Sequence, residues 1–478
     1  LIQHNNNKLE YLFDNNSNLI ISVNEALDES GFYFNSLDKI TKTIYPDLST
    51  AEIKYDKLMN LTQIISDRGL KVNIKSAYGV FGTPKSLEYN IDENLKFDFT
   101  FNGNNQLKFN NNNLIQKIYD KDNVINSIIL NGNQSISYYL ENGYSNLKLP
   151  NGITYSKVRV DALLDKIIIK NISNQIISEI NIHYDFGRNI SKITENSEIK
   201  IESNYDNFKR LSTFKSNGIN NWNISYLNDG RIDSIVYNNT SNSKIYDVFN
   251  RMTKSGKFDL VYDQKGNITK KNYQSQSTEY LYDFENRLTC IVKDHNDSTK
   301  IHYSPDGNIL SIISNDTLFY LPFEFNDVRD YPVSESTCDG NGNLLKYQYF
   351  ERFPNISLVV EFDNLSNSYI FPLMLNNSTI IGFSDNDGNF LSILNYITPY
   401  EILRSDSEIK VLNGRKYFAK LGLSFDGKRF YDSEIHSYLQ VDLLNHDNIS
   451  YFENRNENPD KTDQYFGLKQ NAIVNQIS

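Results

Sequence analysis

The decapeptide YDFGRNISKI (residues 184–193) contains the pattern on which the fold depends. An aromatic residue is followed by Asp, then by a short polar turn, then by apolar residues that alternate with polar ones. We expect Tyr184 to end an incoming strand and Asp185 to cap the turn with its own side chain. Gly or Asn about four residues after the Tyr supplies the positive φ that the reversal needs. Because Ile190 and Ile193 then begin a returning strand, the segment predicts one β-hairpin.

The same pattern recurs along most of the chain at a nearly constant spacing. Intervals of 21 residues separate Phe13 from Phe34 and Phe34 from Tyr55, and further units begin at Tyr205 and Tyr282. A single hairpin cannot bury its apolar face alone, so successive hairpins must stack side by side into one long sheet. Twist and exposed edges force such a sheet to curl. We therefore predict an all-β fold in which stacked hairpins form a spiralling sheet that wraps a hollow shell.

The composition agrees with this fold and excludes several functions. The chain of 478 residues has 33 Tyr and 28 Phe but 3 Met, and aromatic residues favour strands. Its net charge of -11 argues against a nucleic-acid partner. No apolar run reaches the roughly 18 residues of a membrane helix, so we predict no membrane span. The start lacks Met and opens within the pattern, which suggests a piece of a longer protein. Cys290 and Cys338 permit at most one disulfide.

Two longer strings add a family resemblance to the repeats. They are SLDKITK with YPD (residues 36–42 and 45–47) and LPNGITY (residues 149–155). Together with the Tyr-Asp units they resemble the YD repeats of rearrangement-hotspot (Rhs) proteins, of the C components of insecticidal toxin complexes, and of teneurins. The resemblance implies a hollow β-cocoon. In bacterial members of the family, the cavity holds a C-terminal toxin.

The repeats stop at LGLSFDGKRFYDSEIHSYLQVD (residues 421–442). This stretch resembles the Rhs core-associated end, which plugs the cocoon: RFYD (residues 429–432) matches the family's "RYYD", and SYLQVD (residues 437–442) falls on "RFLSPD". The resemblance divides the chain into a YD-repeat shell at 1–396, a plug at 397–468 and a tail at 469–478.

In many relatives this end is a self-cleaving aspartyl protease that cuts after its closing Leu, here Leu468. Such a site needs two carboxylates that share a proton. The resemblance assigns Arg429 as the supporting cation and Asp442 as the first carboxylate, and it places Gln464 where the second Asp is expected. A neutral amide cannot take or give a proton at ordinary pH. We therefore predict that self-cleavage is impaired.

Two alternatives stay open for these residues. Asp463 is one position from Gln464 and would supply the second carboxylate after a small shift, although a shift of one residue normally turns a side chain to the other face of an extended segment. Arg429 and Asp442 would otherwise form a structural pair that closes the plug without chemistry.

Other chemical motifs are sparse. The six His residues show no metal-ligand spacing. The segment DNDGN (residues 385–389) looks faintly like part of a calcium loop, but no Glu follows at the twelfth position, so a hairpin turn is the favoured interpretation. We predict no metal and no cofactor.

The resemblance leads to a functional prediction with one rival. We expect the shell of a polymorphic toxin or of a toxin-complex C-like component, which encloses and shields a toxin cargo absent from this chain. Its partners would be that cargo or a second shell-forming chain. The rival is a secreted or cell-surface adhesive protein whose loops bind a receptor or a glycan. Both predict a secreted or surface location. An enzyme working inside the cavity lacks a paired-carboxylate motif.

Overall fold

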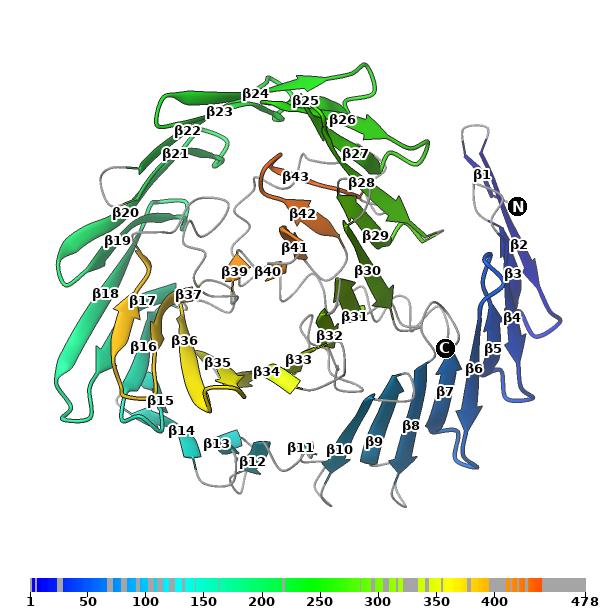
Figure 1. The fold of residues 1–478 in the computed structure, drawn as a ribbon, viewed down its shortest axis with the longest axis horizontal. Coiled ribbons are helices and arrows are strands. Elements are labelled where there is room, and N and C mark those ends of the chain that lie inside the picture. Colours follow the sequence, from blue (N-terminus) through cyan, green and yellow to red (C-terminus); the bar gives the residue numbers. More distant parts are fainter. Residues whose placement is uncertain are drawn as a thin grey trace.

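The computed structural model describes most of the chain up to residue 440. The described residues are 2–4, 7–23, 29–66, 72–78, 84–91, 95–101, 107–109, 115–119, 125–130, 134–141, 143–161, 163–216, 220–283, 285–293, 297–303, 309–314, 317–320, 334–339, 344–353, 356–375, 380–394, 410–412, 415–418, 421–425 and 429–440. Their regular elements are β-strands, arranged as a curled strip with further strands inside it (Figure 1). This part of the chain contains no helix long and apolar enough to cross a membrane.

The strands fall into three sheets. The first contains β1 (Ile2–His4), β2 (Asn7–Phe13), β3 (Leu19–Val23), β4 (Glu29–Phe34), β5 (Ile40–Ile44), β6 (Thr50–Tyr55), β7 (Leu61–Ser66), β8 (Val72–Tyr78), β9 (Pro84–Ile91), β10 (Leu95–Phe101) and β11 (Leu107–Phe109). The second contains β12 (Ile115–Tyr119), β13 (Ile125–Leu130), β14 (Gln134–Glu141), β15 (Tyr144–Lys148), β16 (Thr154–Val160), β17 (Leu163–Lys170), β18 (Ile176–Tyr184), β19 (Ile190–Glu195), β20 (Glu198–Tyr205), β21 (Leu211–Ser216), β22 (Asn220–Tyr226), β23 (Ile232–Tyr237), β24 (Thr240–Tyr246), β25 (Met252–Ser255), β26 (Phe258–Tyr262), β27 (Ile268–Tyr273), β28 (Gln276–Tyr282), β29 (Leu288–Lys293), β30 (Asp297–Tyr303), β31 (Ile309–Ser314), β32 (Thr317–Tyr320), β33 (Ser334–Cys338), β34 (Leu344–Phe353), β35 (Ile356–Asp363), β36 (Ser368–Met374), β37 (Ile380–Ser384) and β38 (Phe390–Ser392). The third contains β39 (Lys410–Leu412), β40 (Arg415–Phe418), β41 (Leu423–Phe425), β42 (Phe430–Asp432) and β43 (Ser437–Tyr438).

Within each sheet, every described strand pairs antiparallel with its neighbours in sequence, so each sheet is a series of hairpins. This confirms the predicted all-β sheet of stacked hairpins. The strip curls without closing into a barrel, and its strands surround the third sheet in the view of Figure 1. Cys290 carries a free thiol, so it forms no disulfide with Cys338.

The Tyr-Asp turns are built as the sequence predicts, with one difference. Asp206 Oδ1 accepts hydrogen bonds from the amides of Phe208 and Arg210, both at 2.9 Å. The left-handed residue lies four positions after the Tyr, as expected, but it is often neither Gly nor Asn. It is Lys209 with φ 63° and Arg188 with φ 65°. We infer that the two bonds to the Asp carboxylate offset the roughly 1–2 kcal/mol that a left-handed L-residue costs.

The calcium-like segment is also a turn of this kind. Asp385 Oδ1 accepts hydrogen bonds from the amides of Asp387 at 3.0 Å and Asn389 at 2.9 Å, between β37 and β38. The favoured hairpin interpretation is therefore correct. Within the described ranges, no group of three or more His, Cys, Asp or Glu side chains could hold a metal ion.

Each repeat is tied to the one before it through its Tyr. The ladder shifts register just before the Tyr, as between Ser225 and Tyr226. The Tyr226 hydroxyl then donates to the Leu211 carbonyl at 2.7 Å, one hairpin back. Its ring lies 4.1 Å from the guanidinium of Arg210, and Arg210 is paired at 2.6 Å with Asp206. The near-constant period therefore follows from a side chain that must reach the turn of the preceding repeat.

The last strands of the second sheet form an inner layer over its first strands. Buried residues of β13–β23 and of β34–β37 form one apolar cluster. Tyr155 on β16 donates its hydroxyl to the Met374 carbonyl on β36. Asn151 Nδ2 donates to Ser384 Oγ at 2.7 Å. The strip therefore overlaps itself, as a spiral must.

Candidate functional site

The predicted protease-like residues are mostly outside the described part of the chain. Asp442, Asp463, Gln464 and Leu468 fall there, so the aspartyl site and its cleavage stay predictions. Arg429 is described and lies directly before β42. Its guanidinium lies 3.9 Å from the centre of the Tyr438 ring.

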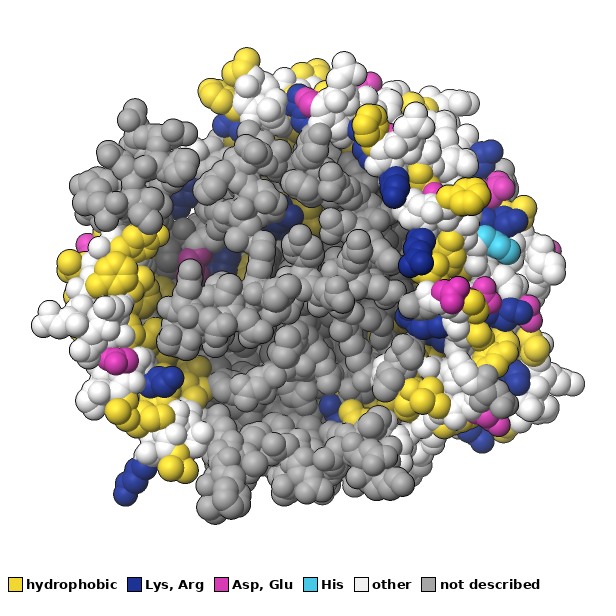
Figure 2. Space-filling model, turned by 180° about the vertical axis from the view of Figure 1, so that it is seen from behind, with side chains coloured by type: hydrophobic (Ala, Val, Ile, Leu, Met, Phe, Trp, Pro, Cys, Tyr) yellow, Lys and Arg dark blue, Asp and Glu magenta, His cyan; other side chains and the backbone are white. Residues whose placement is uncertain are grey.

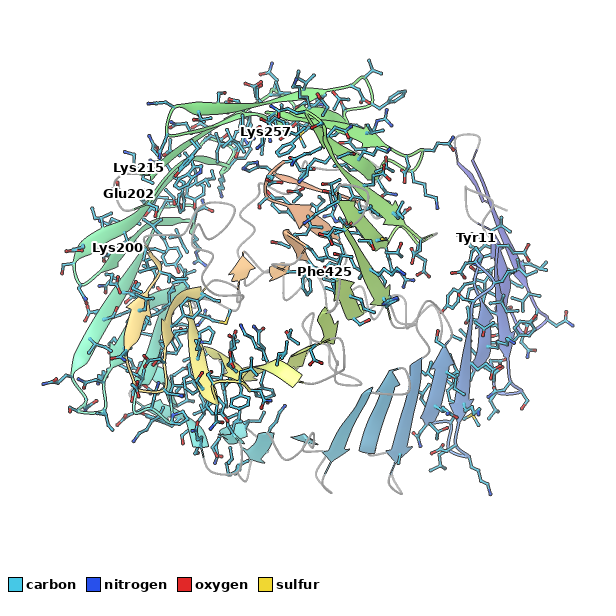
Figure 3. All side chains as sticks on the ribbon, in the orientation of Figure 1. Tyr11, Lys200, Glu202, Lys215, Lys257 and Phe425 are labelled. Carbon is cyan, nitrogen blue, oxygen red and sulfur yellow. The ribbon has the colours of Figure 1, made fainter. Side chains whose placement is uncertain are left out.

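Residues 421–425 and 429–440, here called the inner segment, pack against the inside of the wall strands β24–β31 (Figure 1). Phe430 and Ile435 are fully buried, and Leu439 is 1% exposed. They share one apolar cluster with wall residues such as Ile268 and Leu288. Phe425 also packs on this cluster, within the ring of strands (Figure 3). Apolar burial is therefore the main force that holds the inner segment.

Hydrogen bonds to its backbone fix the register of the inner segment on the wall. The Ile268 amide donates to the Leu439 carbonyl at 2.9 Å. The Tyr282 hydroxyl donates to the same carbonyl at 3.4 Å. Within the inner segment, the Phe430 amide donates to Gln440 Oε1 at 2.7 Å. The two contacts with Leu439 join strands β27 and β28 of the wall to a residue more than 150 positions away in sequence.

A buried ion pair joins Lys271 of β27 to the inner segment. Its Nζ lies 2.6 Å from Asp432 Oδ2 and 2.7 Å from Glu434 Oε2. The Tyr280 hydroxyl donates to Asp432 Oδ2 at 3.4 Å. Burial acts to lower the pKa of Lys271, but the two carboxylates outweigh it and raise the pKa above its ordinary value. Burial also raises the pKa of Tyr280 well above its usual range.

A second polar contact lies on β24 and β25. Lys244 Nζ donates to Ser255 Oγ at 2.5 Å and to the Ile435 carbonyl at 2.9 Å. Ser255 Oγ also donates to the Ile435 carbonyl, at 3.1 Å. The next residue, His436, has a left-handed backbone with φ 57°.

Two of these wall residues, Lys244 and Tyr280, stand at a position of the repeat that is apolar in most other repeats. Two residues before the repeat Tyr, most repeats place an inward residue such as Ile182 or Ile224, which is 3% or 6% exposed. At the same position stand Lys244 and Tyr280, which bond the inner segment. Lys271 pairs in the ladder with the inward Leu260. The loss of the apolar residue is visible in the repeats themselves, so the sequence does carry this signal.

Chemically, the arrangement anchors a segment. Lys244, Ser255, Lys271 and Tyr280 each donate a hydrogen bond to the inner segment. We therefore describe this place as a docking site inside the wall, here called the seat.

The fold of this chain also occurs in solved structures of other proteins. No family model and no curated protein matches the chain. Solved structures do match. The crystal structure of TcdB2-TccC3 superposes with a TM-score of 0.61 at 13% identity, over 91% of this chain and 28% of that chain. The fold is that of toxin-complex proteins. The predicted resemblance to insecticidal toxin complexes is thus confirmed for the fold.

Two further structures agree. TcdB2-TccC3-TEV gives a TM-score of 0.63 at 12% identity, over 93% of this chain and 27% of that chain. The Photorhabdus luminescens Tc holotoxin pore with the mutation TccC3-D651A gives 0.54 at 10% identity, over 94% and 29%. The chain therefore spans less than a third of the length of these toxin-complex chains.

Proposed function

We propose that the chain forms part of the wall of a toxin-complex shell that encloses a polypeptide cargo, with residues 421–440 as a plug. The observation that carries this proposal is the seat. Polar residues replace apolar ones at the inward positions of Lys244 and Tyr280, and each bonds the inner segment. The division into a shell at 1–396, a plug at 397–468 and a tail at 469–478 is part of the proposal.

Confinement explains how such a wall would act. A curled sheet whose repeats are each tied to the next resists local opening, because a hairpin cannot leave without breaking its Tyr contact with the preceding turn. A cargo held behind it is kept from proteases and from early folding. The toxin-complex chains of similar fold are more than three times as long as the matched region, which supports a second shell-forming chain or further residues as the partner that completes the enclosure. Secretion of the assembly is part of this proposal.

Protease protection tests the enclosure. A reporter domain fused after Ser478 should be digested at least tenfold more slowly than the same reporter fused before Leu1, because only the former follows the plug. The comparison is repeated with Lys271→Met, which weakens the seat and should remove the difference. Equal digestion of the two fusions would contradict enclosure.

Self-cleavage remains a proposal of its own. Arg429 and Asp442 would form its cation and first carboxylate, with Gln464 as the impaired second position and Asp463 as the alternative. Mass spectrometry of a freshly made chain extended beyond Ser478 should find it uncut. Complete cutting after Leu468 would show that the site is active.

An adhesive surface protein is the second candidate, favoured by one observation. Large apolar side chains stand exposed at turn tips, among them Phe186 at 112%, Val248 at 90% and Phe208 at 79%. Hydrophobic side chains lie among Lys and Arg along the margin of the molecule (Figure 2). Binding of a cell-surface receptor or glycan would be tested by array binding, in which Phe186→Ser and Phe208→Ser should weaken any signal.

A further inference from the structure

His436 lies at the seat, next to the residue that Lys244 holds. The carbonyl of Ile435 accepts hydrogen bonds from Lys244 Nζ and from Ser255 Oγ. The chain then turns left-handed at His436, whose imidazole Nδ1 is buried while the residue as a whole is partly exposed. The imidazole therefore lies near enough to the Lys244 ammonium for that charge to act on the ring.

Two ammonium groups of the wall bond the inner segment at the seat. Lys244 lies on β24, and its ammonium is buried with its residue 7% exposed. Lys271 on β27 brings a second ammonium, which is already matched by Asp432 and Glu434 of the inner segment. Tyr280 on β28 donates to Asp432 and carries no charge at ordinary pH.

Burial, and after it the charge of Lys244, lower the pKa of His436 from its ordinary value of 6.5 to about 3. The seated imidazole is therefore neutral through the whole mildly acidic range. Once the inner segment leaves the wall, the imidazole enters water and regains its ordinary affinity for a proton.

We propose that the seat is a proton-sensitive latch, in which a proton bound by His436 beside Lys244 holds the inner segment off the wall. The latch regulates the plug on which the proposed function rests. It is nevertheless measurable at the seat without any cargo, so the two proposals can fail separately.

Thermodynamic linkage between proton binding and release of the inner segment gives the direction and the size of the pH effect. Between the pKa of the released imidazole at 6.5 and that of the seated one at about 3, the released state holds one more proton than the seated state. The ratio of released to seated chains therefore rises about tenfold for each pH unit of acidification in this window. Above pH 6.5 the same ratio is independent of this group.

Hydrogen–deuterium exchange of peptides that cover residues 421–440 measures the release. After correction for intrinsic exchange rates, the opening constant of the wild-type inner segment should rise roughly tenfold from pH 6 to pH 5. His436→Asn should keep the seat, because Asn tolerates the left-handed backbone, and should show a flat profile. His183→Asn, at an exposed position on β18, is the matched control and should keep the wild-type slope.

Each of three results would contradict the proposed latch. One is a flat wild-type profile between pH 6 and pH 5. Another is a wild-type slope retained in His436→Asn. The third is parallel opening of wall peptides from β16–β20, which would show general acid unfolding. If His436→Asn does not fold, the wild-type profile and the wall peptides still decide the question.

Discussion

Lys271 and Asp432 lie 161 residues apart in sequence and meet at 2.6 Å inside the wall. Asp432 is 1% exposed and the Lys271 side chain 10%. A pair buried to this extent does not by itself prove stability, because two charges lost their hydration to form it. It does specify position, since neither charge can stay buried without the other.

Lys271→Met should therefore destabilise the chain by about 3–5 kcal/mol, because Asp432 is left buried without its cation. Chemical unfolding measures the change. Lys270→Met is the matched control: Lys270 pairs with Glu279 at 2.7 Å, but its side chain is 46% exposed. Loss of such a surface pair costs about 0–1 kcal/mol. A similar loss in both variants would show that the seat contributes nothing of its own.

Tyr226→Phe should cost about 0.5–1.5 kcal/mol, because it removes the hydroxyl bond to Leu211 and keeps the ring against Arg210. Tyr226→Leu should cost more, since it also removes the stacking. Tyr33→Phe, at a ring that is 53% exposed, should leave thermal unfolding unchanged. If Tyr226→Phe and Tyr33→Phe behave alike, the contact with the preceding turn does not support the repeat.

The sequence predicted the fold well because its signals are local. Each repeat needs only ten positions, as in residues 184–193. These positions contain a Tyr, an Asp that caps the turn, and apolar residues that alternate with polar ones. The inner-layer contact of Tyr155 with Met374 spans 219 residues and leaves no local trace. The same holds for Lys271 and Asp432. Such contacts depend on how far the strip curls, which the summed twist of many strands decides.

The candidate site was predicted only in outline. The resemblance predicted a plug at 397–468, and that division stays a prediction. Residues 421–425 and 429–440 of this region lie inside the wall. The resemblance directed attention to Arg429, which stacks on Tyr438. The wall side of the contact could not be predicted, because in the sequence Lys244 and Lys271 look like ordinary surface lysines and only the strand register shows that they face inward.

The turn carboxylates predict a second acid response, separate from that of His436. Burial acts to raise the pKa of Asp206, but the bonds from Arg210 and from backbone amides outweigh it and lower the pKa below 3.8. A carboxylate with a lowered pKa stabilises the fold above its unfolded value and loses that contribution as the pH falls through the folded value. Stability should therefore decline below about pH 4.

Asp206→Asn should make the stability of the chain fall less steeply as the pH drops below about 4. An Asn already caps one turn of the strip, where Asn35 Oδ1 accepts hydrogen bonds from the amides of Leu37 at 2.9 Å and Lys39 at 3.1 Å. The variant should thus fold at pH 7 with a loss of about 1 kcal/mol from the missing Arg210 pair. Thermal unfolding from pH 7 to pH 3 measures both effects, and an unchanged pH profile would exclude Asp206 as a contributor.

Gly388→Ala tests whether the inner layer rests on the outer one. Gly388 has φ 79°, and a Cβ there would lie 2.9 Å from the Asn151 carbonyl oxygen in the outer layer. Gly143 has nearly the same backbone, with φ 80°, but a Cβ there would meet nothing within 4 Å. Gly143→Ala should therefore cost only the conformational penalty of about 1–2 kcal/mol. Gly388→Ala should cost measurably more in chemical unfolding, because a backbone oxygen cannot move aside without shifting β37 or β16. Equal losses at the two glycines would mean that the layers do not touch at this turn in solution.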